Sequence, residues 1–130
     1  MERDDSVFAE KAGENLSAAM VCFERGYYNS CVNRAYDAMS QIAAALLFRS
    51  GHRPKSKKIG HDWVQAGFTR LFVRRKKRFP HLKNFLNEVQ KLRDTADYSS
   101  EKISRKKAGR VLEKAKTFVG QVSEEVTDDA

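Results

Sequence analysis

Residues that interrupt regular secondary structure are scarce in this chain, which has 2 prolines and 7 glycines among 130 residues. So few interruptions exclude the many turns of a β-sandwich and favour long helices with short connections. No apolar run approaches the ~20 residues that cross a bilayer. The charged start, Met1–Asp5, also lacks the apolar stretch of a secretory signal. We therefore expect a cytoplasmic protein that makes no membrane contact.

Cysteine is equally rare, because Cys22 and Cys31 are the only two. Two cysteines are too few for a disulfide framework or a zinc site, so we expect reduced thiols that pack within helices. No cluster of acids or cysteines accompanies His52 and His61, so we expect solvated or helix-start histidines and not metal ligands. The sequence thus predicts no metal and no cofactor.

Positive charge, by contrast, is abundant and concentrated in the middle of the chain. The net charge is +8, and residues 49–83 hold twelve Lys or Arg against one acid, Asp62. The tail after Ser123 holds four acids and no base. A one-sided distribution favours a polyanionic partner such as RNA, DNA or an acidic protein face, the alternative being a solubilising surface. Five consecutive bases cannot all face a core, so the predicted contact residues are Arg74, Arg75, Lys76, Lys77 and Arg78.

Apolar residues recur at three- and four-residue steps in five segments, which predicts five amphipathic helices. We expect the first helix to end at Gly26 and the second at Gly51, because glycine readily adopts the backbone conformation that closes helices. Residues 51–60 have the composition of an exposed basic loop. A third helix follows, a fourth starts at Pro80, and the last begins near Ser104.

No strand pattern accompanies these helices. The predicted fold class is therefore all-α, an up-and-down antiparallel bundle of about five helices. We expect one domain over residues 1–123 and an acidic, frayed tail over residues 124–130. The second helix is rich in alanine and carries more apolar surface than one core needs, which favours a homodimer.

Two short stretches carry more specific patterns. Gly26–Tyr36 reads G-Y-Y-N-S-C-V-N-R-A-Y, and Leu92–Ser99 reads L-R-D-T-A-D-Y-S. The first resembles the "G-x-Y-x-S-A-x-N-R-A-Y-Y-A" signature of prokaryotic HEPN proteins. The second resembles the "R-x-x-A-D-Y" element that precedes the last helix in that family. Their order and spacing agree, so the resemblance covers roughly residues 5–123.

This resemblance implies a homodimeric helical bundle, often encoded beside a minimal nucleotidyltransferase in toxin–antitoxin-like pairs. Many relatives are metal-independent ribonucleases with an "R-x4-6-H" motif, but here Tyr98 stands where a histidine is expected after Arg93. Tyrosine, with an ordinary pKa of about 10, is a poor general base at neutral pH, whereas histidine titrates there. The planar guanidinium of Arg93 can still grip a phosphate.

Polar residues within the two motifs are expected to meet between the second and fourth helices. The predicted cluster consists of Asn33, Arg34, Arg93, Asp97 and Tyr98. One interpretation is a nucleotide- or phosphate-binding site. The other is structural: a buried Arg34–Asp97 pair whose remaining hydrogen bonds are made by Asn33 and Tyr36.

The sequence favours a HEPN-like module that binds RNA or a nucleotide and pairs with a minimal nucleotidyltransferase in a toxin–antitoxin-like or defence system. Because the histidine is missing from its place, we expect binding and not catalysis. The alternative is a metal-independent ribonuclease toxin that uses Arg93 and Tyr98. An unrelated DNA-binding bundle is a third hypothesis, and it predicts preference for duplex DNA.

Overall fold

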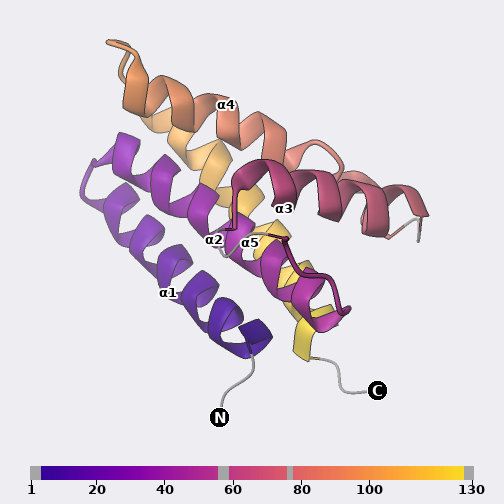
Figure 1. Ribbon diagram of the computed structural model, residues 1–130. Coiled ribbons are helices and arrows are strands. Elements are labelled where there is room, and N and C mark those ends of the chain that lie inside the picture. Colours follow the sequence, from indigo (N-terminus) through magenta and orange to yellow (C-terminus); the bar gives the residue numbers. More distant parts are fainter. Residues whose placement is uncertain (1–3, 56–58, 76–77, 128–130) are drawn as a thin grey trace.

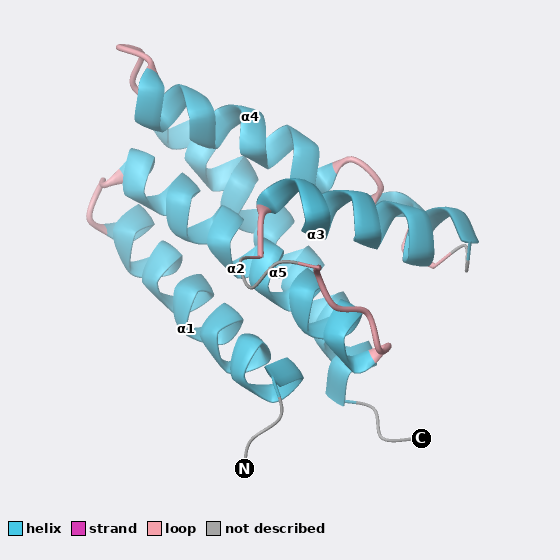
Figure 2. Cartoon of the chain, viewed as in Figure 1, coloured by secondary structure: helices cyan, strands magenta, loops and turns pink. Residues whose placement is uncertain are grey.

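Helices account for the regular structure in the computed structural model, which describes residues 4–55, 59–75 and 78–127 (Figures 1 and 2). In chain order the α-helices are α1 (Asp4–Glu24), α2 (Tyr28–Arg49), α3 (His61–Phe68), α4 (Phe85–Tyr98) and α5 (Arg105–Thr127). No strand occurs in the described ranges, so the predicted all-α bundle is confirmed. No helix of the described part is both long and apolar enough to traverse a membrane.

The second helix forms the centre of the bundle, with α1, α4 and α5 packed around it and α3 crossing it (Figure 1). Its small side chains let these neighbours approach closely; Ala35, Ala38 and Ala45, for example, are fully buried. The reason we gave for a homodimer is therefore wrong, because the chain's own helices cover the alanine-rich surface. The homodimer itself stays a prediction.

Glycines close the first two helices, as predicted. Gly26 has a φ of 80°, and the next N–H, of Tyr27, donates to the carbonyl of Cys22 at 2.8 Å. Gly51 has a φ of 86°, and the N–H of His52 donates to the carbonyl of Leu47 at 2.9 Å. Both bonds belong to the hydrogen-bonded turn that satisfies the last carbonyls of a helix. The connections at both ends of α2 are thereby fixed.

The third helix does not simply end, because it continues as the π-helical segment η1 (Thr69–Arg75). A single 3-10 turn, η2 (Pro80–Leu82), then precedes α4, and Pro80 is the first residue of η2. Phe68 anchors this region to the bundle: its ring lies 5.1 Å from that of Phe118 on α5. The prediction of a third helix is confirmed, but nothing in the sequence had indicated its change of helical type.

The end of the chain also differs from expectation. The last helix, α5, runs to Thr127, past the predicted start of a frayed tail at residue 124. Val126 is buried, and Glu125 forms an ion pair with Arg78. The helix persists because these two residues give it contacts on the bundle. Residues 128–130 lie outside the described ranges.

Candidate functional site

Arg93 lies midway along α4, and its guanidinium reaches between α2 and α3. Its Nη1 lies 3.3 Å from Nε2 of His61 on α3. Its Nη2 lies 3.8 Å from a carboxylate oxygen of Asp37 on α2, and its Nε lies 4.0 Å from a carboxylate oxygen of Asp97. The side chain is 25% exposed, so solvent and ligands can reach part of it. We refer to Asn33, Tyr36, Asp37, His61, Arg93 and Asp97 as the Arg93 cluster.

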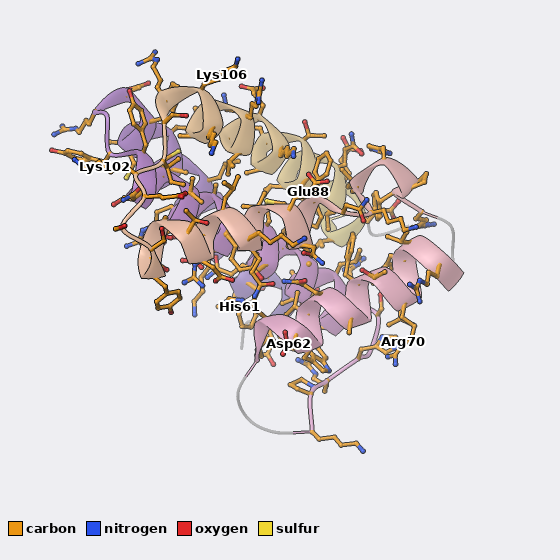
Figure 3. The ribbon with its side chains drawn as sticks, turned by 90° about the horizontal axis from the view of Figure 1, so that it is seen from above. His61, Asp62, Arg70, Glu88, Lys102 and Lys106 are labelled. Atoms are coloured by element: carbon orange, nitrogen blue, oxygen red, sulfur yellow. The ribbon has the colours of Figure 1, made fainter. Side chains whose placement is uncertain are left out.

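His61 is the first residue of α3, following Gly60 at the end of the basic loop. Figure 3 shows it at the start of α3, on the side that faces α4. Because a guanidinium only donates hydrogen bonds, Nε2 of His61 accepts this one and the ring proton resides on Nδ1. The ring also packs edge-on against Tyr36, with centroids 4.9 Å apart. The imidazole is thus held in a defined orientation beside Arg93.

Asp37 brings a second group capable of proton transfer. Burial raises the pKa of this carboxyl above its ordinary value, even though the cationic Arg93 and the neighbouring His61 and Arg34 act to lower it. Desolvation therefore outweighs the attraction of the surrounding cations. A carboxyl of this kind keeps its proton at higher pH than an exposed aspartate does.

Tyr36 supports the cluster from beneath. It is fully buried, its ring lies 5.5 Å below the guanidinium carbon of Arg93, and its hydroxyl accepts a hydrogen bond of 2.9 Å from Gln65. Gln65 also donates to Gln90 of α4. Burial raises the pKa of Tyr36, so its hydroxyl stays protonated near neutral pH. These contacts give Tyr36 a positioning role toward Arg93.

The predicted Arg34–Asp97 pair does not form, and Asn33 takes the place of Arg34. Asn33 donates to Asp97 at 2.9 Å, whereas Arg34 donates to Asn15 of α1 at 3.2 Å. The reason is helical geometry, since neighbouring residues on an α-helix point about 100° apart. When Asn33 faces α4, Arg34 must face α1. Arg34 therefore lies outside the Arg93 cluster.

Tyr98 also stands apart from the cluster that we expected it to join. It is the last residue of α4 and is 83% exposed. Five residues along an α-helix correspond to a rotation of about 140° beyond one full turn. The helix therefore directs Arg93 and Tyr98 to different sides. Tyr98 therefore makes no contact with Arg93, the residue with which it would have to act in catalysis.

The predicted basic run is divided among different surroundings. Arg74 is exposed at the end of η1, whereas Arg78 is paired with Glu125 of α5. For Arg75 only the backbone, in η1, is described. Lys76 and Lys77 lie outside the described ranges. Arg74 and Arg78 are thus both exposed, but of these two Arg78 is already paired with an acid.

A small cavity adjoins the Arg93 cluster on the side of α1. Its volume is about 170 Å³, and both Asp37 and His61 line it, together with Ser40 and Gln41. Two buried atoms of the cluster, Nε of Arg93 and Oδ1 of Asn33, have no hydrogen-bond partner among the described residues. Incomplete hydrogen bonding around a partly exposed cation is more typical of a functional site than of a purely structural one.

No set of three or more His, Cys, Asp or Glu side chains in the described ranges is arranged to hold an ion.

His61 is the main site residue that sequence reasoning missed. The sequence predicts a solvated or helix-start histidine; His61 does begin α3, but the sequence did not place it in a functional cluster. A signal was present, because the polar residues His61, Gln65 and Thr69 recur every four residues beside the apolar stripe of Val64 and Phe68. Such a second, polar stripe indicates a face that meets a polar partner.

Comparison with known proteins places this geometry in a family. The HEPN domain matches residues 6–126, so the chain belongs to the HEPN domain family. "Putative toxin MJ0605" of Methanocaldococcus jannaschii is 31% identical over 118 residues, which cover 87% of this chain and 81% of that protein. "Putative toxin MJ0142" of the same organism is 27% identical over 121 residues, covering 92% and 80%.

Proposed function

We propose that this protein is a toxin-like HEPN protein that acts on RNA and cleaves it without a metal ion at the Arg93 cluster. The observation that carries the proposal is the 3.3 Å contact between Arg93 and His61. The family match and the two relatives named as putative toxins support the broader class. The histidine absent after Arg93 in the sequence has a counterpart here, contributed by a different helix.

The chemistry follows from what each side chain can do. A phosphate bound to the guanidinium of Arg93 would replace its contact with His61 and leave Nε2 free to accept a proton. His61 would then take the proton of a ribose 2′-hydroxyl, and the oxygen would attack the neighbouring phosphorus. Arg93 would stabilise the charge that develops on the phosphate. Asp37 is mainly ionised at neutral pH, but its raised pKa leaves it a larger protonated fraction than an ordinary aspartate has, and this fraction would protonate the departing 5′-oxygen, leaving a 2′,3′-cyclic phosphate.

A second candidate function is RNA or nucleotide binding without cleavage, as the sequence had favoured. The specific observation for it is that two carboxylates, Asp37 and Asp97, lie within 4.0 Å of Arg93. They weaken the attraction of the site for a phosphate and hold the arginine in place. In this case the cluster would mainly join α2, α3 and α4.

In either case we propose that the protein is one component of a toxin–antitoxin-like pair, with a minimal nucleotidyltransferase as its partner. We also propose that it acts as a homodimer in the cytoplasm. The resemblance to HEPN proteins supports these points. Co-expression with a nucleotidyltransferase encoded beside it, followed by purification through a tag on one chain, tests the pairing.

The decisive experiment is RNA cleavage in the presence of EDTA. We expect wild-type protein to cleave mixed RNA, and His61→Ala to slow cleavage by about 10²- to 10⁴-fold, the usual contribution of one proton-transfer group. His81→Ala is the matched control, because His81 is exposed and contacts Gln121 of α5. Tyr98→Phe should cleave as wild type does.

Three results would contradict the proposal that RNA is cleaved at the Arg93 cluster. Full activity in His61→Ala would show that His61 does not transfer the proton. Loss of activity in Tyr98→Phe would support the alternative that pairs Arg93 with Tyr98. Tight RNA binding without any cleavage would instead favour the second candidate.

A further inference from the structure

The seam between α3 and α4 has a regular register that extends beyond the Arg93 cluster. His61 meets Arg93, and one helical turn further Gln65 meets Gln90. Steps of four residues on α3 thus correspond to steps of three on the antiparallel α4. The next step brings Thr69 beside Leu86 and Asn87, and these residues do line one common pocket. Polar side chains therefore follow one another along the whole seam.

The π-helical segment extends this polar face by one more residue. A π-helix repeats hydrogen bonds every five residues, so a residue five positions on lies on the same side. Arg74 is five residues after Thr69 and lines the same pocket, whereas the residue before it, Val73, is buried. In a regular α-helix the residue four positions after Thr69, which is Val73, would face the seam instead of Arg74. The change of helical type thus presents a cation where an apolar side chain would otherwise stand.

Two adjoining hollows open along this part of the seam. One, of about 200 Å³, lies between η1 and the start of α4 and is lined by Arg74 and Lys83. The other, of about 470 Å³, adds Arg70. They share Gln65, Thr69 and Arg74 and are therefore continuous. We refer to the two hollows together as the seam groove.

The charge of the seam groove is entirely of one sign. Its basic residues are Arg70, Arg74 and Lys83, and no acid lines either hollow. No ion pair joins these three side chains to an acid within the described ranges. The nearby acid of α4, Glu88, is paired with Lys114 of α5. The cations of the seam groove are thus free to meet an external anion.

Amide side chains stand between these cations. Gln65, Asn84 and Asn87 line the seam groove, and each amide offers both a donor and an acceptor. Unpaired bases present matching donors and acceptors on their edges, whereas in duplex RNA these edges are engaged in pairing. Spaced cations with amides between them therefore fit a strand that carries one phosphate and one free base edge per nucleotide.

We infer that the seam groove binds single-stranded RNA and directs it to the Arg93 cluster. Arg70, Arg74 and Lys83 contact phosphates, and the amides of Asn84 and Asn87 contact base edges. This inference rests on the proposed RNA cleavage at the Arg93 cluster, and it adds that the RNA is single-stranded and approaches the cluster along the seam groove. It goes further in assigning a binding surface outside the two sequence motifs.

Binding of a 2′-O-methylated single strand, which cannot be cleaved through its 2′-oxygen, tests the seam groove alone. The groove variant is Arg70→Ser/Arg74→Ser/Lys83→Ser. The matched control, Lys106→Ser/Lys107→Ser/Arg110→Ser, removes the same charge from exposed positions of α5. Figure 3 shows Lys106 at the opposite edge of the molecule from Arg70.

The measurement is a salt titration followed by fluorescence anisotropy. Each phosphate contact contributes about 0.7 to the slope of log affinity against log salt concentration. Loss of three contacts should therefore make the slope of the groove variant flatter than that of wild type by about 2. The control should keep the wild-type slope. Asn84→Ala/Asn87→Ala should keep the slope but bind roughly 3- to 10-fold more weakly, the usual effect of one or two hydrogen bonds. All three variants should keep the wild-type melting temperature, since the changed side chains are exposed.

Equal losses in the groove variant and the α5 control would overturn the inference, because net charge alone would then explain binding. Binding of duplex RNA as tight as that of the single strand would overturn it as well. Failure of the proposed function has a different signature. If the protein cleaves no RNA but the groove variant alone loses affinity and slope, the cleavage proposal fails and the seam groove stands.

Discussion

His61 and Arg93 are 32 residues apart in the sequence, and their side chains meet at 3.3 Å across the junction of α3 and α4. The two residues belong to different helices, so no local helical spacing brings them together. Their contact depends on the basic loop that precedes α3 and on the crossing of α3 over α2. The pair is therefore a product of the tertiary fold, and its loss should be measurable both in stability and in function.

Removal of the guanidinium should destabilise the fold modestly. Arg93→Ala leaves Asp37 and Asp97 facing each other without their shared cation. Because the side chain is 25% exposed, solvent screens part of this repulsion, and we expect a loss of about 1–2 kcal/mol in the free energy of unfolding. Urea denaturation followed by circular dichroism measures it.

The control for this change is Lys91→Ala, an exposed position two residues away on the same helix, which should alter stability by less than about 0.5 kcal/mol. Arg93→Lys should recover most of the stability but not the bidentate grip on a phosphate. If Arg93→Ala is as stable as wild type, the cluster does not help to join α4 to the bundle.

The pKa of Asp37 predicts how stability depends on pH. Since burial raises this pKa above its ordinary 3.8, the folded state binds the proton more tightly than the unfolded state does. Stability contributed by this group therefore falls as pH rises from about 3.8 through the raised value, and the cost persists at neutral pH. Asp37→Asn removes the ionisation and should be more stable than wild type at neutral pH.

The difference in melting temperature between Asp37→Asn and wild type should vanish below about pH 4, where the wild-type carboxyl is protonated in both states. Asn87→Ala, at an exposed position of α4 that has no ionisable group, serves as the control and should show no such growing difference. A melting-temperature difference that stays constant from acid to neutral pH would contradict the assignment of the raised pKa to Asp37.

The homodimer, if it forms, must use a surface other than α2. Two large apolar side chains are exposed on α1, Met20 at 39% and Val21 at 50%. We expect a species of about 30 kDa, twice the 14.9 kDa of one chain, in sedimentation at micromolar concentration. Met20→Asp/Val21→Asp should shift it toward the monomer, because charges placed in an apolar interface oppose association.

A matched change at two exposed positions of α4, Asn87→Asp/Lys91→Asp, should leave the dimer intact. A wild-type protein that sediments as a 14.9 kDa species would contradict the homodimer altogether.

The helices were predictable because each carries a local signal. Apolar residues at three- and four-residue steps produce the stripes, and Gly26 and Gly51 mark ends through backbone conformations that favour glycine. These signals lie within one or two turns of the residues they describe. The number and order of the helices therefore followed from the sequence alone.

The candidate site was predictable only in part, because side-chain direction depends on how helices cross. The motifs identified Asn33, Arg93 and Asp97, which do meet. They could not decide whether Asn33 or Arg34 faces α4, since a rotation of one residue exchanges them. His61 lies in no motif; the polar stripe to which it belongs indicates a polar face on α3, but it cannot name Arg93, on another helix, as the partner of His61.

The π-helical segment also determines where the chain can change in length. Seven residues, Thr69–Arg75, follow a path that turns more slowly than an α-helix, as though one residue had been inserted. Deletion of one residue there, such as the exposed Arg70, would restore α-helical spacing and keep Arg74 in line with Thr69. The same deletion within α3 would rotate every later side chain by about 100° and separate Gln65 from His61. This short stretch is thus a place along the seam where the chain can lose a residue and keep the register of its core, although the charge of Arg70 is then missing from the seam groove.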